Sequence, residues 1–468
     1  MKGLLISLFL LWAMPVWAID SQLAELEKQT LPDLNEPTIS ITTLPNGMKL
    51  YYLQDSELPV VKLAAVMKLG NVYDSKAERG HAGFFMSLLR NGGSVTHPSR
   101  RIDEELEFLA ASISSDSDNE LSQLKMVCLQ KDFAKVSELF FSLLLKPAFE
   151  ADRLEILRKS ALDGLKQRNE NPMGIAGREF AQSIYGQDTP LAWLSTAETI
   201  NKISVKSLKA YYATHVAANL MTLVAVSPLP VAEFTAAIHP KIANWTQQLP
   251  APTYPLKMEK VWQPGIDLIS FEGNQSAIML GHLAETRFNP DKYAIVVANS
   301  ILGGTTFGAR LGDRIRTELG YAYGITASFG FDTVYGLFRI AVQTKSETTV
   351  DTIQEVKKIL SDMLSTRPIS STEVAAAKDK ILNPLVFEYE DAFNVVLMRM
   401  RYDYYGYPPN YVSIYQKAIN AVTVEQVNDV VTRYFFPDQL RITIVGKPET
   451  IKNLNQLGKV NRLMLDEE

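Results

Sequence analysis

Hydrophobic and polar positions along this chain first alternate, as in β-strands, and then recur every three to four residues, as in helices. This order appears twice, once in each half of the chain. In the first half, residues 39–44 and 48–53 alternate around a Pro-Asn-Gly turn, and residues 60–69 follow as a third apolar strand. Apolar positions then recur every three to four residues, which predicts helices. The helices are expected at residues 77–91, 101–110, 131–144 and 151–168.

The second half follows the same plan. An amphipathic helix leads into an apolar strand in both halves, at residues 204–226 and 423–446, which indicates a weak internal repeat. The order of elements predicts an α+β fold of two homologous halves, each a mostly antiparallel β-sheet packed against α-helices. Strands are expected near 268–271, 277–283, 321–330 and 335–344, and helices at 291–302, at 306–318 and from 349 onward.

Length and composition agree with a globular chain of more than one domain. The chain has 468 residues, too many for one ordinary domain, and 46% of them are hydrophobic, enough for substantial cores. The net charge is −5 with acidic and basic residues interspersed, so we expect no nucleic-acid binding. A proline-rich stretch at residues 247–264 is the expected linker between the halves.

The first 18 residues have the features of a secretory signal peptide. Lys2 precedes an apolar stretch, and small residues precede the expected cleavage site after Ala18. An uncleaved anchor is the alternative, but about 14 apolar residues are short for a span of roughly 20. We therefore expect an exported, periplasmic protein without stable membrane insertion. The single cysteine, Cys128, lies in a predicted strand and is expected to be a buried, inert thiol.

Residues 80–93, Gly-His-Ala-Gly-Phe-Phe-Met-Ser-Leu-Leu-Arg-Asn-Gly-Gly, resemble the zinc helix of the pitrilysin/insulinase/mitochondrial processing peptidase family. That family has Gly-x-x-His-x-x-Glu-His, which places two ligands and a base on one helix face. The resemblance implies that Gly83, Met86 and Ser87 replace the first histidine, the glutamate base and the second histidine. The third ligand, a glutamate about 76 residues further on, falls on Gly164. The resemblance therefore implies that this chain holds no zinc.

The remaining candidate ligands do not form a recognisable site. Asp116 and Asp118 suggest a cation loop, but the glycine and the final glutamate of a calcium loop are missing, so a polar turn between Ile113 and Leu121 is preferred. Motifs of hydrolases, phosphate loops and dinucleotide sites are not found. The histidines are scattered and are interpreted as surface or structural residues: His81, His97, His215, His239 and His282.

Residues 302–324 are similar to the C-terminal segment of the same family, where a Gly-Gly loop precedes a helix that ends in arginine, and Gly-x-Ala-Tyr follows. The resemblance implies that Arg316 and Tyr323 reach a facing zinc site and hold the substrate carbonyl, with Gly303 and Gly304 as weaker substrate-binding candidates. A guanidinium and a phenol can stabilise the oxyanion of a tetrahedral intermediate. The alternative is an ordinary helix-end arginine and a half-buried strand tyrosine.

In some bacterial members of this family, two similar chains divide the work and together enclose a clam-shell chamber. The resemblance thus implies the zinc-free subunit of a periplasmic heterodimeric metallopeptidase, inactive alone, which binds peptides and donates Arg316 and Tyr323 to a homologous zinc-bearing partner. The alternative is a non-catalytic scaffold or peptide-binding protein, as in the core subunits of respiratory complexes; a stand-alone hydrolase lacks any recognisable triad. The expected divisions are a signal peptide at 1–18, metallopeptidase-like domains at 19–246 and 265–468, and the linker at 247–264.

Overall fold

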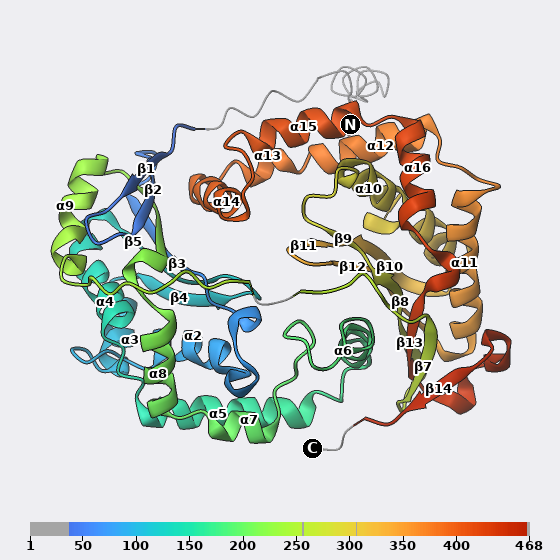
Figure 1. Cartoon of the computed structure of the whole chain (residues 1–468), viewed down its shortest axis with the longest axis horizontal. Helices are drawn as coiled ribbons and strands as arrows, with labels where there is room; N and C mark the ends of the chain where they lie inside the picture. Colours follow the sequence, from blue (N-terminus) through green and yellow to red (C-terminus); the bar gives the residue numbers. More distant parts are fainter. Residues whose placement is uncertain (1–36, 255–256, 306, 466–468) are drawn as a thin grey trace, which may run out of the picture. The chain divides into compact units, whose positions relative to one another are not determined.

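Two six-stranded sheets organise the residues that the computed structural model describes, which are 37–254, 257–305 and 307–465 (Figure 1). The first sheet has the strand order β1-β2-β6-β3-β5-β4. Only β2 and β6 pair in parallel within it. Its strands are β1 (Ser40–Thr43), β2 (Lys49–Gln54), β3 (Val60–Met67), β4 (Ser112–Ser117), β5 (Ser122–Leu129) and β6 (Met221–Ser227).

The second sheet has the strand order β10-β12-β8-β13-β7-β14. Its antiparallel strands are followed by two parallel pairs, β13 with β7 and β7 with β14. Its strands are β7 (Gly265–Ser270), β8 (Gln275–Leu283), β10 (Ala322–Phe329), β12 (Leu337–Lys345), β13 (Arg441–Gly446) and β14 (Val460–Leu463). A separate short pair joins β9 (Glu285–Thr286) to β11 (Phe331–Asp332).

The two sheets repeat one topology. Read from β14, the second sheet places β7, β13, β8, β12 and β10 where the first places β2, β6, β3, β5 and β4. In both, a helix with a capping box leads into the third strand: α8 (Val205–His215) before β6, and α16 (Val424–Tyr434) before β13. The predicted α+β fold of two similar halves is confirmed.

Most helices cover the outer face of the sheet in their own half. The described part of the first half contains α2 (His81–Asn91), α3 (Ser99–Phe108), α4 (Phe133–Leu145), α5 (Ala151–Gln167), α6 (Pro172–Tyr185), α7 (Ala197–Lys202), α8 and α9 (Val231–Ile242). The second contains α10 (Lys292–Asn299), α11 (Thr349–Leu364), α12 (Ser371–Leu382), α13 (Leu385–Glu388), α14 (Ala392–Tyr405), α15 (Tyr411–Ala421) and α16.

Each half also lends one helix to the sheet of the other half (Figure 1). Successive residues of β3 point to opposite faces, so Leu63 joins the core beneath α2 and α4, while Ala64 joins a second core with Val396 of α14. In the same way, Phe180 of α6 packs with Ile269 of the second sheet. The central strands β3, β6, β8 and β13 are therefore buried on two faces, whereas outer strands such as β10 and β12 alternate between buried and exposed residues.

Several elements differ in detail from the sequence-based expectations. The predicted polar turn around Asp116 is wrong, because residues 112–117 form the edge strand β4 and only the turn at Asp118 follows. The helix expected at 306–318 begins at Arg310 and continues as a π-helix over Gly312–Glu318. Cys128 is buried on β5, as predicted, and burial raises the pKa of its thiol to about 12.

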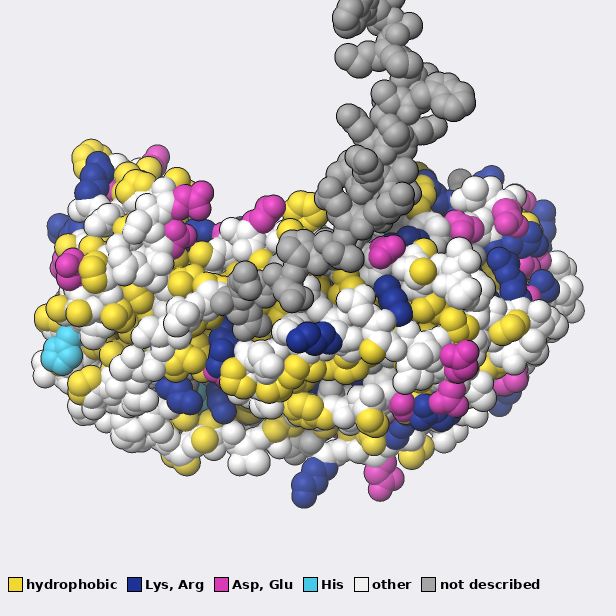
Figure 2. Space-filling view, turned by 90° about the horizontal axis from the view of Figure 1, so that it is seen from above, with side chains coloured by type: hydrophobic (Ala, Val, Ile, Leu, Met, Phe, Trp, Pro, Cys, Tyr) yellow, Lys and Arg dark blue, Asp and Glu magenta, His cyan; other side chains and the backbone are white. Residues whose placement is uncertain are grey.

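Charge and hydropathy add two observations. Figure 2 shows acidic and basic side chains interspersed on the face it displays, without a continuous basic stripe. Within the described residues, every helix is too short or too polar to cross a bilayer. The predicted signal peptide, residues 1–18, lies outside the described residues.

Candidate functional site

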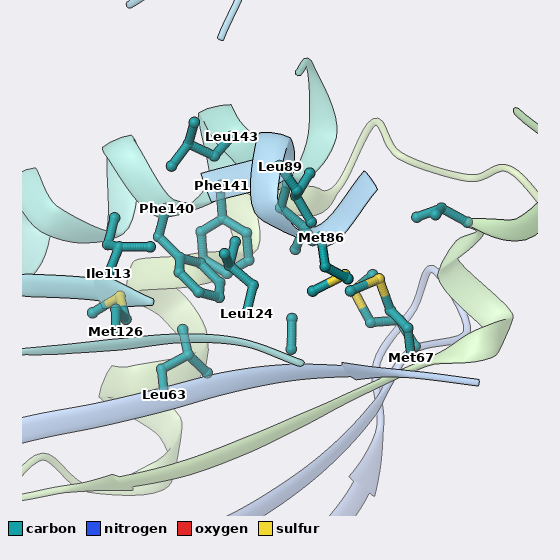
Figure 3. Close-up of a cluster of buried hydrophobic side chains, with 14 of the residues drawn as sticks. Leu63, Met67, Met86, Leu89, Ile113, Leu124, Met126, Phe140, Phe141 and Leu143 are labelled. Carbon is teal, nitrogen blue, oxygen red and sulfur yellow. The ribbon is translucent and has the colours of Figure 1, made fainter. Parts of the chain in front are cut away.

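On the helix that resembles a zinc helix, the middle of the three replaced positions is buried in the core. On α2, Gly83 is exposed and Ser87 is partly exposed, but Met86 is only 2% exposed and belongs to the main core of the first half. Figure 3 shows Met86 pointing into this cluster beside Leu89 and toward Met67 of β3. The position that would hold a glutamate base is therefore filled by a buried thioether.

The fourth replaced position lies on a neighbouring helix. Gly164 is an exposed residue of α5, and α5 packs against α2. A Cβ atom added at Gly164 or at Gly83 would meet no atom within 4 Å. The three solvent-facing positions of the lost site are thus on adjacent helices, with open space beside both glycines.

Nearby polar groups are already engaged in structural contacts. Both ring nitrogens of His81 have partners, with Nδ1 3.0 Å from the Glu78 carbonyl oxygen and Nε2 3.1 Å from Ser207 Oγ. Burial lowers the pKa of His81. Asp74 accepts a hydrogen bond of 2.6 Å from the hydroxyl of Tyr211, and burial raises the pKa of Asp74 to about 7. These groups hold the start of α2 in place.

Among the residues that the structure describes, no three His, Cys, Asp or Glu side chains come together in an arrangement suited to a metal ion. The residues Gly83, Met86, Ser87 and Gly164 themselves offer neither an imidazole nor a carboxylate.

The second candidate region begins at the Gly-Gly loop after α10. The helix ends there in a kinked stretch over Ser300–Gly304, in which Gly303 is buried and has non-helical backbone angles. A Cβ atom at Gly303 would lie 2.8 Å from Leu311 Cδ1 and 3.0 Å from Ala327 Cβ, so a larger residue would require both neighbours to shift. π-Helical turns are rare and occur often at functional sites. One follows this loop, over Gly312–Glu318.

The helix after the loop carries three arginines with different surroundings. Arg310 is 7% exposed and makes a two-pronged ion pair with Glu373, with nitrogen-to-oxygen distances of 2.7 and 2.9 Å. Arg314 pairs with Glu355 at 2.7 Å and with Glu318 at 2.8 Å. These two arginines are neutralised by carboxylates and connect the helix to α12 and α11.

Arg316 has no such partner among the described residues. Its guanidinium lies over two aromatic rings, with Cζ 4.5 Å from the centre of the Phe307 ring and 5.5 Å from that of Tyr323. Its Nη1 atom is buried and makes no hydrogen bond to any described residue. The two rings therefore orient a cation that keeps a donor available for a further acceptor.

Tyr323 is presented by an irregular edge strand. β10 lies at the edge of the second sheet, and its pairing with β12 shifts between Ala322 and Ile325, which places Tyr323 in a β-bulge. Bulges redirect side chains and are frequent beside functional sites. Tyr323 is 91% exposed, so the half-buried tyrosine of the alternative interpretation is not what the structure contains.

The loop that carries Phe307 is tied down from a distant helix. Lys380 of α12 donates to the carbonyl oxygens of Phe307 at 3.2 Å and Gly308 at 2.6 Å. Phe307 is 68% exposed, although it is a large apolar side chain. A cavity of about 540 Å³ beside the loop is lined by Lys380 and Arg310, and its lining does not include Arg316 or Tyr323. Tyr323 is thus exposed to solvent, and the partly buried guanidinium of Arg316 lies beside its ring, outside this cavity.

Residue by residue, the structure brings Arg316 and Tyr323 together and places Gly303 and Gly304 in the loop before their helix. It adds two residues that the sequence did not single out. Phe307 stacks on Arg316, and Lys380 fixes the backbone of Phe307. Phe307 fell within the helix expected at 306–318, and its place directly before Gly308 was the available signal for a loop.

Comparison with known proteins places both halves in one family. Residues 50–191 match the model of the insulinase family, peptidase family M16, and residues 202–381 match the model of the peptidase M16 inactive domain. A non-peptidase homolog from Helicobacter pylori, YmxG, is 24% identical over 410 residues, covering 86% of this chain and 92% of that protein. Mitochondrial cytochrome b-c1 complex subunit 1 of Rattus norvegicus is 25% identical, with 57% of this chain and 56% of that protein covered.

A solved structure shows the same fold. The crystal structure of a peptidase M16 inactive domain from Pseudomonas fluorescens superposes with a TM-score of 0.78, at 24% sequence identity. The superposition covers 88% of this chain and 98% of that one.

Proposed function

The chain belongs to peptidase family M16, and on this premise we propose that it is the zinc-free subunit of a heterodimeric zinc metallopeptidase. In this proposal a homologous partner chain carries the zinc, its water and the glutamate base. This chain contributes peptide-binding surface together with Arg316 and Tyr323.

The single observation that carries the proposal is the environment of Arg316. Two arginines of the same helix are paired with carboxylates, whereas Arg316 is held only by aromatic rings and has a buried donor atom without a described partner. An unpaired buried donor is unfavourable in a purely structural role, by roughly 1–3 kcal/mol. A binding role for the guanidinium removes that difficulty.

The lost zinc positions support the same division of labour. Met86 is in the core and Gly83 and Gly164 lack side chains, so this chain supplies neither a base nor metal ligands at these positions. Tyr323 is exposed, where a second chain could approach it, and the Arg316 guanidinium lies beside its ring.

The chemistry available to this chain is hydrogen-bond donation to developing negative charge. When a water attacks a peptide carbonyl, the carbonyl oxygen becomes an oxyanion. Arg316 Nη1 and the Tyr323 hydroxyl are donors of the kind that stabilise such an oxygen, and one donor of this type is worth on the order of 10²–10³ in rate. Zinc bound by the partner would supply the activated water.

The proposed location is the periplasm. It rests on the signal-peptide features of residues 1–18, which call for export before the mature chain folds.

The test is a set of matched variants assayed with a zinc-bearing family member of the same cell. We expect Arg316→Met and Tyr323→Phe each to lower kcat by roughly 10²-fold or more while the zinc content of the mixture stays unchanged. Arg100→Met, which removes a surface guanidinium whose side chain is 87% exposed, is the matched control and should have no effect. Unchanged turnover in both donor variants would remove the proposed role.

The alternative is a scaffold or peptide-binding protein without a catalytic contribution. The similarity to cytochrome b-c1 complex subunit 1 is the observation that favours it. A scaffold would tolerate Arg316→Met and Tyr323→Phe, so the same variants distinguish the two functions.

A further inference from the structure

A second cationic site, which the proposed function does not use, surrounds a cavity of about 450 Å³. The cavity is bordered by the segment before α2, the segment after α5, helix α6 and the residues that follow β14. Four cationic and two acidic side chains line it: Lys76, Arg79, Arg168, Arg178, Glu179 and Asp188. The lining is therefore positively charged on balance and largely polar.

The two acids in the cavity are already paired with other cations. Asp188 accepts from Lys76 at 2.7 Å, and Glu179 accepts from Arg178 at 2.9 Å. Neither contact involves Arg79. Arg79 therefore makes no ion pair with these acids, although its charge, after that of Lys76, contributes to the lowered pKa of Asp188.

Arg79 is held in position but is not saturated. Its Nη1 donates to the carbonyl oxygen of Leu194 at 3.3 Å, and its guanidinium lies 5.2 Å from the centre of the Trp193 ring. Its Nε atom is buried and makes no hydrogen bond to any described residue. A guanidinium carries several donors, so the donors of Arg79 that Leu194 does not take remain for a carboxylate.

The chain itself places acidic residues next to this cavity in the sequence. Leu463, Met464 and Leu465 line the cavity. The three positions after Leu465 read Asp-Glu-Glu and lie outside the described residues. Carboxylates of the required kind could therefore come from positions 466–468 or from a separate peptide.

We propose that this cavity is a binding site for the carboxylates of a short acidic peptide segment, with Arg79 as its anchoring residue and Lys76 as a second contact at the rim. Arg79 directly precedes Gly80, the N-cap residue of α2, so the site lies next in sequence to that helix. Binding at this cavity needs no partner chain. A negative result in the binding test can therefore be told apart from a failure of the proposed function.

The test measures binding of a fluorescein-labelled Asp-Glu-Glu peptide to the isolated full chain by fluorescence anisotropy. An Asn-Gln-Gln peptide of the same length is the ligand control. The protein is used in its native form and with the substitutions Asp466→Asn, Glu467→Gln and Glu468→Gln combined, which distinguishes the two sources of carboxylate. Arg79→Met is added to each form, and Arg100→Met is the matched control for loss of one positive charge. Thermal unfolding confirms that every variant is folded.

We expect the acidic peptide to bind and the neutral peptide not to bind. Arg79→Met should weaken binding roughly tenfold or more, the size expected for one charge-assisted hydrogen bond, whereas Arg100→Met should not. Binding should also weaken between about 0.05 M and 0.5 M NaCl, because salt screens partly exposed charges. Binding only to the neutralised form identifies residues 466–468 as the natural occupant, and equal binding to both forms identifies a separate peptide. If neither form distinguishes the two peptides, or Arg79→Met binds as tightly as Arg100→Met, the proposal is wrong.

Discussion

Replacing Met86 by glutamate restores the residue type that the family has at this position, and we expect it to destabilise the protein strongly. Met86 is 2% exposed and packs in the core of the first half. Removing the methionine forfeits about 2 kcal/mol of apolar burial. Keeping the new carboxyl neutral at pH 7 adds about 1.4 kcal/mol for each pH unit above its ordinary pKa near 4.3, or roughly 3–4 kcal/mol. We therefore expect Met86→Glu to lose about 4–6 kcal/mol of unfolding free energy at pH 7.

The pH dependence of this loss has a definite sign. Burial raises the pKa of the introduced carboxyl in the folded state above its value in the unfolded state. The extra penalty is therefore absent below about pH 4, where the carboxyl is protonated in both states, and it grows as the pH rises. Between pH 5 and pH 7 the loss should increase by about 3 kcal/mol.

Urea denaturation at pH 5, 6 and 7, followed by circular dichroism, measures both quantities. Met86→Gln is the isosteric control and should lose stability without the added pH dependence. Ser87→Glu, next in sequence but partly exposed, should change stability by less than about 1 kcal/mol. A Met86→Glu protein that matches Ser87→Glu in stability at pH 7 would refute the placement of this position in the core, and with it the account of the lost site.

Three further outcomes are expected. Gly303→Ala should displace the loop, because its Cβ would lie 2.8 Å from Leu311 Cδ1, whereas Gly320→Ala should lose only about 1–2 kcal/mol of unfolding free energy through its φ of +63°. Denaturation of both variants, together with hydrogen exchange in the loop of Gly303→Ala, tests this ranking. A larger loss of stability in Gly320→Ala would contradict it. Lys380→Met should speed hydrogen exchange at the amides of residues 307–309 with little change elsewhere, and unaltered exchange would show that the lysine does not hold the loop. The purified chain should contain no stoichiometric zinc by elemental analysis, and one equivalent of bound zinc would overturn the alignment of the α2 motif.

Much of the fold could be predicted from the sequence because apolar residues recur with clear periodicity in its strands and helices. β3 alternates between two cores, and α4 has an apolar face, so both elements are visible locally. The helix–strand repeat was detectable because α8 and α16 begin with capping boxes and lead into apolar strands. These signals depend only on neighbouring residues.

The exchange of helices between the halves could not be predicted. An apolar face on α6 or α14 indicates that the helix is buried, but it does not indicate which sheet buries it. β4 was missed for a different reason. Its sequence, Ser-Ile-Ser-Ser-Asp-Ser, has one buried apolar residue, Ile113, and it forms a strand because β5 pairs with it along its length.

The candidate site was predicted in part. The family resemblance carried by the Gly-Gly loop and the Gly-x-Ala-Tyr segment implied Arg316 and Tyr323 as a pair, and the structure places the guanidinium over the ring. The stacking of Phe307 on Arg316 depends on the backbone of the loop, which Lys380 fixes from a position more than 70 residues away. Long-range contacts of this kind leave no periodic pattern in the sequence.

The most direct test of the central proposal is cleavage of a quenched fluorescent peptide library by this chain, by a zinc-bearing family member from the same cell, and by the two mixed, each with and without a chelator. The account predicts that activity appears only in the mixture and disappears with the chelator. A zinc-bearing chain that is equally active alone, or a mixture that remains silent, would contradict it and favour the scaffold or peptide-binding function.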